Sequence, residues 1–307
     1  MTQSIDQRTV DSALSYFESE LTRLDTDVIK PLSDFTWSRD IPTTTLALSD
    51  RAFAYDEVSH TGVDQKISWA NPNQTETPAV GVRYKRTSTG TNLWAQEIRK
   101  TIFELDDASR LNRQLDSDLF ASLNMKVQQD LNKIAYLGDS EMGWSGFLNN
   151  ASIADTGSAI AVWTDSTTND AIIGALQTIH SDMYTKTRVA ANKILLPFSR
   201  WSVLANRKYN EYGMTLLQFI EEQSAMSRLA GGIKIEVCHD CAGILAAGKD
   251  RLVMYRSDRN AIVLPMSTLG NTPIEQRQFH LITSYYMNAG QVTFKRPELI
   301  RYATMNV

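Results

Sequence analysis

The chain has 307 residues, of which 42% are hydrophobic and 21% are charged, so it can bury one large core or two smaller ones. The net charge is −4, from 31 basic and 35 acidic residues, and no segment concentrates basic side chains, which argues against a dedicated nucleic-acid-binding protein. The two cysteines exclude a disulfide framework, and the absence of a long apolar run or a secretory signal at Met-Thr-Gln-Ser-Ile-Asp leads us to expect a cytoplasmic protein without a membrane segment.

Residues 1–51 are predicted to form an N-terminal arm. A helix is expected over residues 9–24, because apolar side chains recur there at steps of three and four. After it, Pro31 and Pro42 favour extended backbone. The arm carries apolar side chains but no neighbouring element that could bury them, so we expect it to pack on another subunit. The arm residues predicted to make such contacts are Phe17, Leu21, Phe35 and Trp37.

Residues 52–92 are predicted to form a long, polar, extended excursion. The expected strands are Ala52–His60, Lys66–Ala70 and Val80–Thr89, and turn-forming residues fill positions 71–78. A two-stranded ribbon is only marginally stable by itself in water, so this segment needs support from outside. We therefore expect intersubunit contacts here too, at Lys66, Trp69 and Tyr84. The alternative is a surface loop of a monomeric domain.

A long helix is predicted over residues 104–137, within a span that holds no glycine and no proline. Its length would be about 50 Å at about 1.5 Å per residue. The pattern alone also fits a coiled coil or an ordinary core helix. The apolar side chains that recur at steps of three and four are Ala108, Leu111, Leu115, Leu119, Leu123, Val127, Leu131 and Ile134.

The predicted helix runs into a glycine-punctuated loop at residues 136–150. Gly138, Gly143 and Gly146 permit backbone angles that other residues resist. Phe147 and Leu148 are expected to return the chain to a core. The spacing matches no phosphate-binding fingerprint, because no Lys-Ser/Thr pair follows and the loop comes after a helix rather than a strand.

Helices and strands alternate over the rest of the chain, which predicts an α+β or α/β lobe followed by a strand pair. The first helix is expected to be capped by Thr168 or Asn169. The tail strands are expected to be joined through residues 288–290. The expected helices are Asn169–Thr185, Phe198–Asn206 and Thr215–Gln223, and the expected strands are Lys193–Pro197, Ile233–Cys238, Leu252–Arg256, Ala261–Leu264, Phe279–Met287 and Val292–Tyr302.

Three segments together resemble one family. They are the turn Gly-Asp-Ser-Glu-Met-Gly-Trp-Ser-Gly-Phe-Leu-Asn at 138–149 after the long helix, the arm segments 20–25 and 31–42, and the closing segment 289–302. Their order and spacing are similar to those of the major capsid proteins of tailed bacteriophages with the Hong Kong 97 fold, in the subgroup that lacks a scaffolding extension. One departure is Gln291 after Gly290, where the family pattern is apolar.

The resemblance implies an α+β fold with an N-terminal arm (1–51), an E-loop hairpin (52–92), a P domain with a long spine helix (93–165 and 272–307) and an A domain (166–271). It implies a structural protein, not an enzyme, that assembles with itself as hexamers and pentamers into the icosahedral head shell around packaged double-stranded DNA. Further implied partners are portal and decoration proteins and non-specific DNA contacts on the inner face. The implied location is the virion, after assembly in the cytoplasm of the bacterial host.

The search for chemistry yields one constellation, Cys238-His-Asp-Cys241. A structural zinc site needs four ligands, and His60, His180 and His280 are far apart in the sequence. We interpret both cysteines as buried structural residues, with metal binding or redox chemistry as alternatives. We assign no catalytic, cofactor-binding or metal residue. Besides the phage head shell, an encapsulin-like nanocompartment shell and a soluble enzyme with an unrecognised site stay open.

Overall fold

The computed structural model describes residues 35–61, 80–105, 115–155, 163, 167–209 and 213–305. The chain divides into two units, residues 1–34 and residues 35–307, and every described residue belongs to the second. The predicted helix at 9–24 and the predicted strand at 66–70 lie outside the described residues. So do four of the predicted contact residues, Phe17, Leu21, Lys66 and Trp69.

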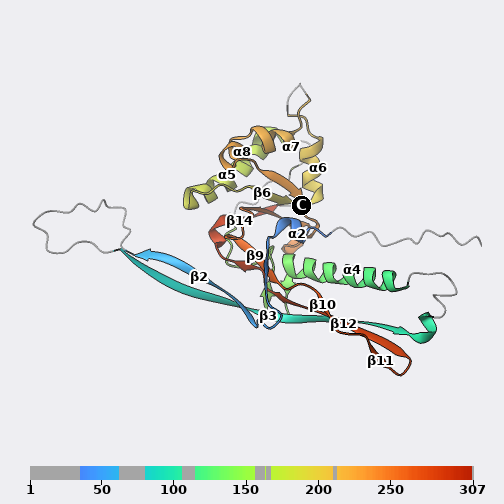
Figure 1. The fold of residues 1–307 in the computed structure, drawn as a ribbon. Helices are drawn as coiled ribbons and strands as arrows, with labels where there is room; N and C mark the ends of the chain where they lie inside the picture. Colours follow the sequence, from blue (N-terminus) through green and yellow to red (C-terminus); the bar gives the residue numbers. More distant parts are fainter. Residues whose placement is uncertain are drawn as a thin grey trace, which may run out of the picture. The chain divides into compact units, whose positions relative to one another are not determined.

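A long sheet runs through the second unit in the order β1-β9-β12-β3-β2 (Figure 1). Strands β10 and β11 pair with β12, and β13 pairs with β9. The strands are β1 (Thr43–Thr45), β2 (Ala52–Thr61), β3 (Gly81–Thr101), β9 (Ile262–Met266), β10 (Gly270–Asn271), β11 (Glu275–Arg277), β12 (His280–Gly290) and β13 (Thr293–Phe294).

Strand β3 has 21 residues, and its two halves have different partners. The first half pairs with β2, and the second pairs antiparallel with β12, from Thr91↔Gly290 to Thr101↔His280. The strand that we expected to end at Thr89 therefore continues for twelve further residues, to Thr101. It continues because β12 supplies hydrogen-bond partners and because Trp94 and Ile98 fall on one face and pack on the core.

A second, compact sheet has the order β14-β8-β6-β7. Strands β6 and β7 are parallel, and β8 is antiparallel to both β6 and β14. The predicted strands at 193–197, 233–238 and 252–256 are confirmed within two residues at each end. The bounds are β6 (Lys193–Leu196), β7 (Lys234–Val237), β8 (Asp250–Tyr255) and β14 (Ile300–Met305).

The prediction for the tail is wrong in two respects. Residues 288–290 continue β12 instead of turning, because the buried Asn288 is held by hydrogen bonds from its amide to the carbonyl oxygens of Ala47 (3.2 Å) and Asp50 (2.6 Å). The expected strand 292–302 is divided into β13, a 3₁₀ turn at Pro297–Leu299, and β14. Pro297 interrupts it because proline has no backbone N–H for a ladder.

The predicted helices of the lobe are largely confirmed as α5 (Asn169–Thr187), α6 (Phe198–Asn206) and α7 (Leu216–Gln218). Thr168 is the cap of α5, with its hydroxyl accepting from the N–H of Ala171 at 3.3 Å. The segment after α7 is a π-helical turn, Phe219–Gln223, and an unpredicted helix follows, α8 (Ala225–Ala230). Ser224 caps α8, and Gly231 ends it with φ of 76°.

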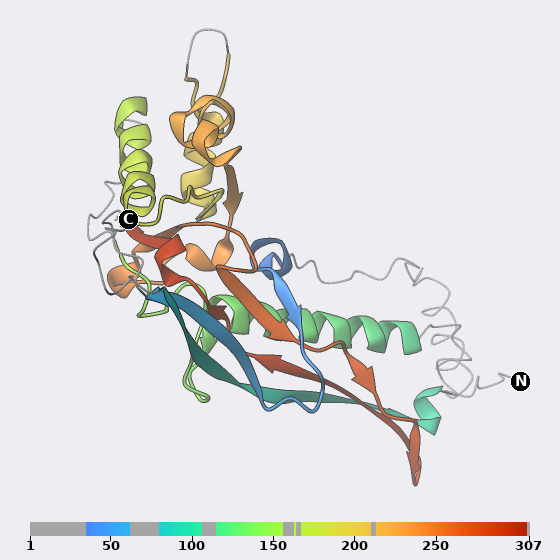
Figure 2. The same ribbon diagram turned by 60° about the vertical axis from the view of Figure 1, so that its left-hand side comes forward.

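Helix α4 (Leu115–Tyr136) lies along one face of the β3–β12 pair (Figures 1 and 2). Its 22 residues span about 33 Å. The predicted apolar face is confirmed at Leu123, Val127 and Leu131, which are buried. The helix was expected to begin at residue 104; residues 102–105 are helical, but residues 106–114 lie outside the described residues. A continuous rod from 104 therefore stays a prediction.

The backbone of the loop after α4 requires glycine at three positions. Gly138 and Gly143 have φ of 77° and 67°, where residues with a Cβ are strained. A Cβ on Gly146 would lie 2.3 Å from the carbonyl oxygen of Tyr136. The side chain of Asn149 closes the loop by accepting from the N–H of Gly146 and donating to the carbonyl of Leu137, both at 2.6 Å. Phe147 and Leu148 are fully buried, as predicted.

Residues 35–46 fall within the predicted arm, and they pack on the elements that follow them in the chain. They belong to the second unit, and they form the short helix α2 (Trp37–Asp40) and strand β1, which pairs with β9. Trp37, Ile41 and Leu46 are buried against their own chain. The sequence analysis missed this because the partner strand β9 lies more than 200 residues away. We call residues 35–46 the strap.

Strand pairing also crosses the predicted boundary between the A and P domains at residue 271. Strand β9, from the predicted A segment, pairs with β1 and β12 of the long sheet. Strand β14, from the predicted P segment, pairs with β8 of the compact sheet. Two cores result: one lies between α4 and the sheets, and the other surrounds α5 in the lobe. The division into arm, E-loop, P and A domains remains a prediction.

Candidate intersubunit surface

The first half of β3 and strand β2 form a two-stranded ribbon, residues 52–61 and 81–90, paired from Ala52↔Gly90 to Thr61↔Gly81. No side chain described in this ribbon is buried. Contacts with the rest of the chain occur near its base. The hydroxyl of Tyr55 donates to the carbonyl of Phe294 at 3.3 Å, and the hydroxyls of Thr89 and Thr293 are 3.1 Å apart.

The two faces of the ribbon differ in polarity. Side chains alternate between faces along a strand, so the cross-strand pairs Val58↔Tyr84 and His60↔Val82 share one face. Val80 has the same parity as Val82. Exposed fractions are 47% for Val58, 70% for Val80, 49% for Val82 and 73% for Tyr84. We call these four residues the apolar strip. Contiguous exposed apolar side chains mark interaction sites more often than single ones do.

At the level of the apolar strip, the opposite face of the ribbon is polar, with the pairs Glu57↔Lys85 and Ser59↔Arg83. On the face of the apolar strip, Arg86 binds Asp56 through two hydrogen bonds of 2.8 and 3.0 Å. The hydrogen bond from Arg86 lowers the pKa of Asp56. Because both side chains are exposed, this pair stabilises the strand register more than the fold.

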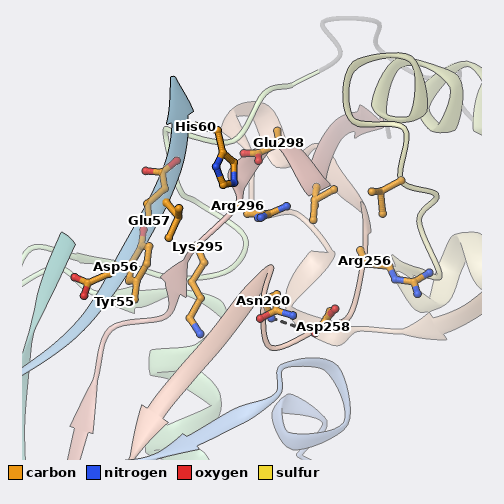
Figure 3. Close-up of a pocket in the computed structure, with 13 residues that line it drawn as sticks. Tyr55, Asp56, Glu57, His60, Arg256, Asp258, Asn260, Lys295, Arg296 and Glu298 are labelled. Carbon is orange, nitrogen blue, oxygen red and sulfur yellow. Dashed lines mark hydrogen bonds between the residues drawn. The ribbon is translucent and has the colours of Figure 1, made fainter. Parts of the chain in front are cut away.

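A cavity of about 840 Å³ opens beside the ribbon. Figure 3 shows the ribbon residues Glu57 and His60 on one side and Lys295, Arg296 and Glu298 of the body on the other. Among the described residues, none of these five side chains forms an ion pair with another. The lining is polar and carries charges of both signs, whereas small-molecule sites are mostly apolar and enclosed. The cavity therefore resembles an unfilled contact surface more than a ligand pocket.

A second group of exposed apolar side chains lies at the other end of β3. Ile102, Phe103, Ile274 and Phe279 are all exposed; we call them the end cluster. The rings of Phe103 and Phe279 are 5.8 Å apart, and the N–H of Ile102 donates to the carbonyl of Phe279 at 3.0 Å. The sequence did not predict this cluster, because the neighbouring positions from 104 onward fit the pattern of the long helix.

Comparison with known proteins identifies the family of the chain. Residues 66–305 match the model of the protein family described as Major capsid protein. The chain belongs to the major capsid protein family. No curated protein sequence matches it, so the assignment to the family rests on the family model.

Three solved structures illustrate the likeness of this capsid protein to others. The match to the capsid of Myoviridae phage XM1 has 16% sequence identity and a TM-score of 0.75. It covers 94% of this chain and 98% of the XM1 chain. The match to the capsid of an empty GTA particle has 14% identity and a TM-score of 0.61, and it covers 96% of this chain and 99% of the GTA chain. The match to the virus-like particle from Pyrococcus furiosus has 12% identity and a TM-score of 0.52, and it covers 86% of this chain and 90% of the Pyrococcus chain.

The predicted α+β fold of the Hong Kong 97 type is thereby confirmed. Family and fold are those of a structural capsid shell protein, not of an enzyme. Cys238 and Cys241 are free and fully buried, as expected for structural cysteines. Within the described ranges, no three His, Cys, Asp or Glu side chains group as metal ligands would. No helix in the described part of the capsid protein has the length and apolar character needed to span a membrane.

The predicted contact residues that can be located fall into two groups. Tyr84 is exposed on the apolar strip. Trp37 is 5% exposed, and its indole N–H donates to Gln128 Oε1 at 2.9 Å, so it packs inside its own subunit. Phe35 is half-buried against the same core. The sequence analysis did not select Val58, Val80 or Val82, although their alternation with polar residues was a readable signal.

Proposed function

We propose that this capsid protein forms the icosahedral head shell of a tailed phage, as hexamers and pentamers around packaged double-stranded DNA. Assembly takes place in the cytoplasm of the bacterial host, and the mature location is the virion. Portal and decoration proteins are further partners, and DNA touches the inner face without sequence preference. The likeness to the capsids of phage XM1 and the GTA particle supports this function. No observation favours the nanocompartment shell over the phage head.

The observation that carries the proposal is the ribbon. A two-stranded ribbon with no buried side chain is marginal in water, yet this one exposes an apolar strip. The proposal assigns the apolar strip to a neighbouring copy of the same chain. The strip and the surface that receives it are different parts of the molecule, and such head-to-tail contacts close into rings when the rotation between copies allows it. Many weak contacts of this kind, acting together, stabilise a shell.

The test is a double variant, Val82→Asp with Tyr84→Asp, which adds two negative charges to the apolar strip. The matched control is Arg83→Asp, which changes the charge by the same amount on the polar face of the same strand. Sedimentation velocity and electron microscopy report closed particles, and circular dichroism reports the fold. We expect the double variant to stay folded and to form no closed particles, and the control to assemble.

Two results would contradict the proposal. Normal particles from the double variant would show that the apolar strip makes no essential contact. Loss of particles in both variants would show that assembly responds to ribbon charge and not to the apolar strip. In either case the ribbon would not be the contact proposed here.

A further inference from the structure

The strap is held by a buried cluster of charged and hydroxyl groups centred on Asp40, whose side chain is fully buried. Lys193 Nζ of β6 lies 2.9 Å from Asp40 Oδ1 and also donates to the carbonyl of Arg39 at 2.8 Å. The Arg39 guanidinium binds the same carboxylate at 2.8 and 3.1 Å. The hydroxyl of Tyr136, at the end of α4, donates to Asp40 Oδ2, and that of Tyr255 donates to the Asp40 carbonyl at 2.7 Å.

These contacts join the strap to the major parts of the body through one residue. Tyr136 belongs to the helix of the long sheet, and Lys193 and Tyr255 belong to the compact sheet. Arg39 adds a further link to the compact sheet, to Glu236 at 3.0 Å. Lys193 is only 8% exposed, so loss of the Asp40 charge would leave it buried with no described carboxylate within ion-pair distance. Breaking a buried pair from one side is strongly unfavourable.

Apart from this cluster, the strap is attached to the body by the buried side chains of Trp37, Ile41 and Leu46 and by few backbone bonds. Strand β1 contributes three register pairs, Thr43–Thr45 against Leu264–Met266, at the edge of the long sheet. The pairs β9–β13, β12–β3 and β8–β14 form without the strap. An edge segment whose removal leaves the other strand pairs intact can open locally at lower free energy than global unfolding.

We propose that the strap opens as a unit while the rest of the body stays folded, and that Asp40 is its latch. The strap begins where the described body begins, at residue 35, so its opening frees the buried side chains of Trp37 and Ile41 for contact with a neighbouring copy. This last consequence rests on the proposed shell function. The opening itself is a property of one subunit and is testable without assembly.

The two cysteine thiols of the chain can report this opening. Cys238 and Cys241 are its two cysteines, and both are fully buried in the core that contains Trp37 and Ile41 of the strap. Arg39 Nη2 donates to the carbonyl of Val237 at 2.8 Å, one residue before Cys238. The pKa of the Cys241 thiol is raised by its hydrogen bond with Cys238, by burial and by nearby negative charge that includes Asp40. A buried, protonated thiol is unreactive until it is exposed.

The experiment measures the rate at which a thiol reagent, 5,5′-dithiobis(2-nitrobenzoate), labels the full-length unassembled protein. We expect Asp40→Asn to raise the labelling rate at least tenfold. The matched control is Asp56→Asn, which removes the exposed carboxylate paired with Arg86 in the ribbon and should leave the rate unchanged. Hydrogen exchange should rise in peptides covering 35–46 and stay slow in β8.

If Asp40→Asn does not fold, the proposal is tested on the wild-type protein, by measuring its labelling rate at increasing urea concentration. Local opening exposes little surface, so the rate should rise with a slope well below the equilibrium m-value. A slope equal to the global m-value, or equal rates for Asp40→Asn and wild type, would overturn the proposal. Failure here leaves the shell proposal untouched, because particle formation by the ribbon variants is measured separately.

Discussion

The two halves of strand β3 differ in how far their own chain buries them. One half packs on the core, and the other half does not. Residues 91–101 pair with β12 and place Trp94 and Ile98 against the core under α4. Residues 81–90 pair only with β2 and bury no side chain. The same strand is thus a folding element over residues 91–101 and, under the proposed function, an assembly element over residues 81–90. Substitutions in residues 81–90 should change particle formation, and substitutions in residues 91–101 should change the free energy of unfolding.

The largest effect on folding is expected at the helix that covers the second half of β3. Leu131 of α4 is 1% exposed, so Leu131→Ala should lower the free energy of unfolding by about 2–5 kcal/mol. The control is Gln129→Ala on the exposed side of α4, which should change it by less than about 0.5 kcal/mol. Urea unfolding followed by circular dichroism measures both. Equal losses would mean that α4 does not cover the sheet as described.

A smaller loss is expected from the indole that links β3 to α4. The N–H of Trp94 donates to Asp130 Oδ2 at 2.9 Å, and bonds to charged groups are worth about 1.5–3 kcal/mol. Trp37 makes the equivalent bond to the neutral amide of Gln128, which is worth about 0.5–1.5 kcal/mol. Trp94→Phe should therefore cost more unfolding free energy than Trp37→Phe in the same urea titration. The reverse order would contradict this account of α4 packing.

Truncation on the first half of β3 should leave the subunit stable and weaken assembly. Tyr84 is 73% exposed, so Tyr84→Ala should change the free energy of unfolding by less than about 0.5 kcal/mol. The protein concentration needed to form particles should rise, because each copy loses an apolar contact. Light scattering across a concentration series measures this. A stability loss similar to that of Leu131→Ala would erase the distinction between the two halves.

The smallest effect is expected from the exposed ion pair of the ribbon. Because Arg86 lowers the pKa of Asp56 in the folded state, the pair stabilises the ribbon above the ordinary Asp pKa. That contribution is lost as the pH falls through the lowered pKa. Hydrogen exchange of ribbon peptides, corrected for intrinsic rates, should therefore rise at acid pH in the wild type. Asp56→Asn should remove this pH dependence, and added salt should weaken it.

Local signals in the sequence predicted the local elements well. Helix α6 has the bounds expected for it, and Thr168 caps α5 as one of two candidates. The glycines at 138 and 143 were readable because positive φ favours that residue type. Helix α8 also had a readable signal, a serine cap at 224 and a glycine stop at 231, that was not used.

What could not be predicted depends on partners distant in sequence. No local sequence signal predicts that the strand continues through residues 91–101. It continues because these residues pair with β12, nearly 200 residues later in the chain. The burial of Asp40 against Lys193 and Tyr136 likewise requires three separate elements to meet. For the candidate site, the sequence located the ribbon and Tyr84. It did not reveal that Val58 lies opposite Tyr84, because that depends on the register of the two strands.

The uninterrupted backbone of β3 has a mechanical consequence. A pull on the ribbon along its length is carried directly into residues 91–101, where eleven register pairs connect β3 to β12. Hydrogen bonds in an antiparallel pair lie across the strands, so this load shears them together instead of peeling them one after another. A stretched shell wall built from such subunits would share tension over the whole ladder, and the ribbon would act as a tether anchored in the sheet.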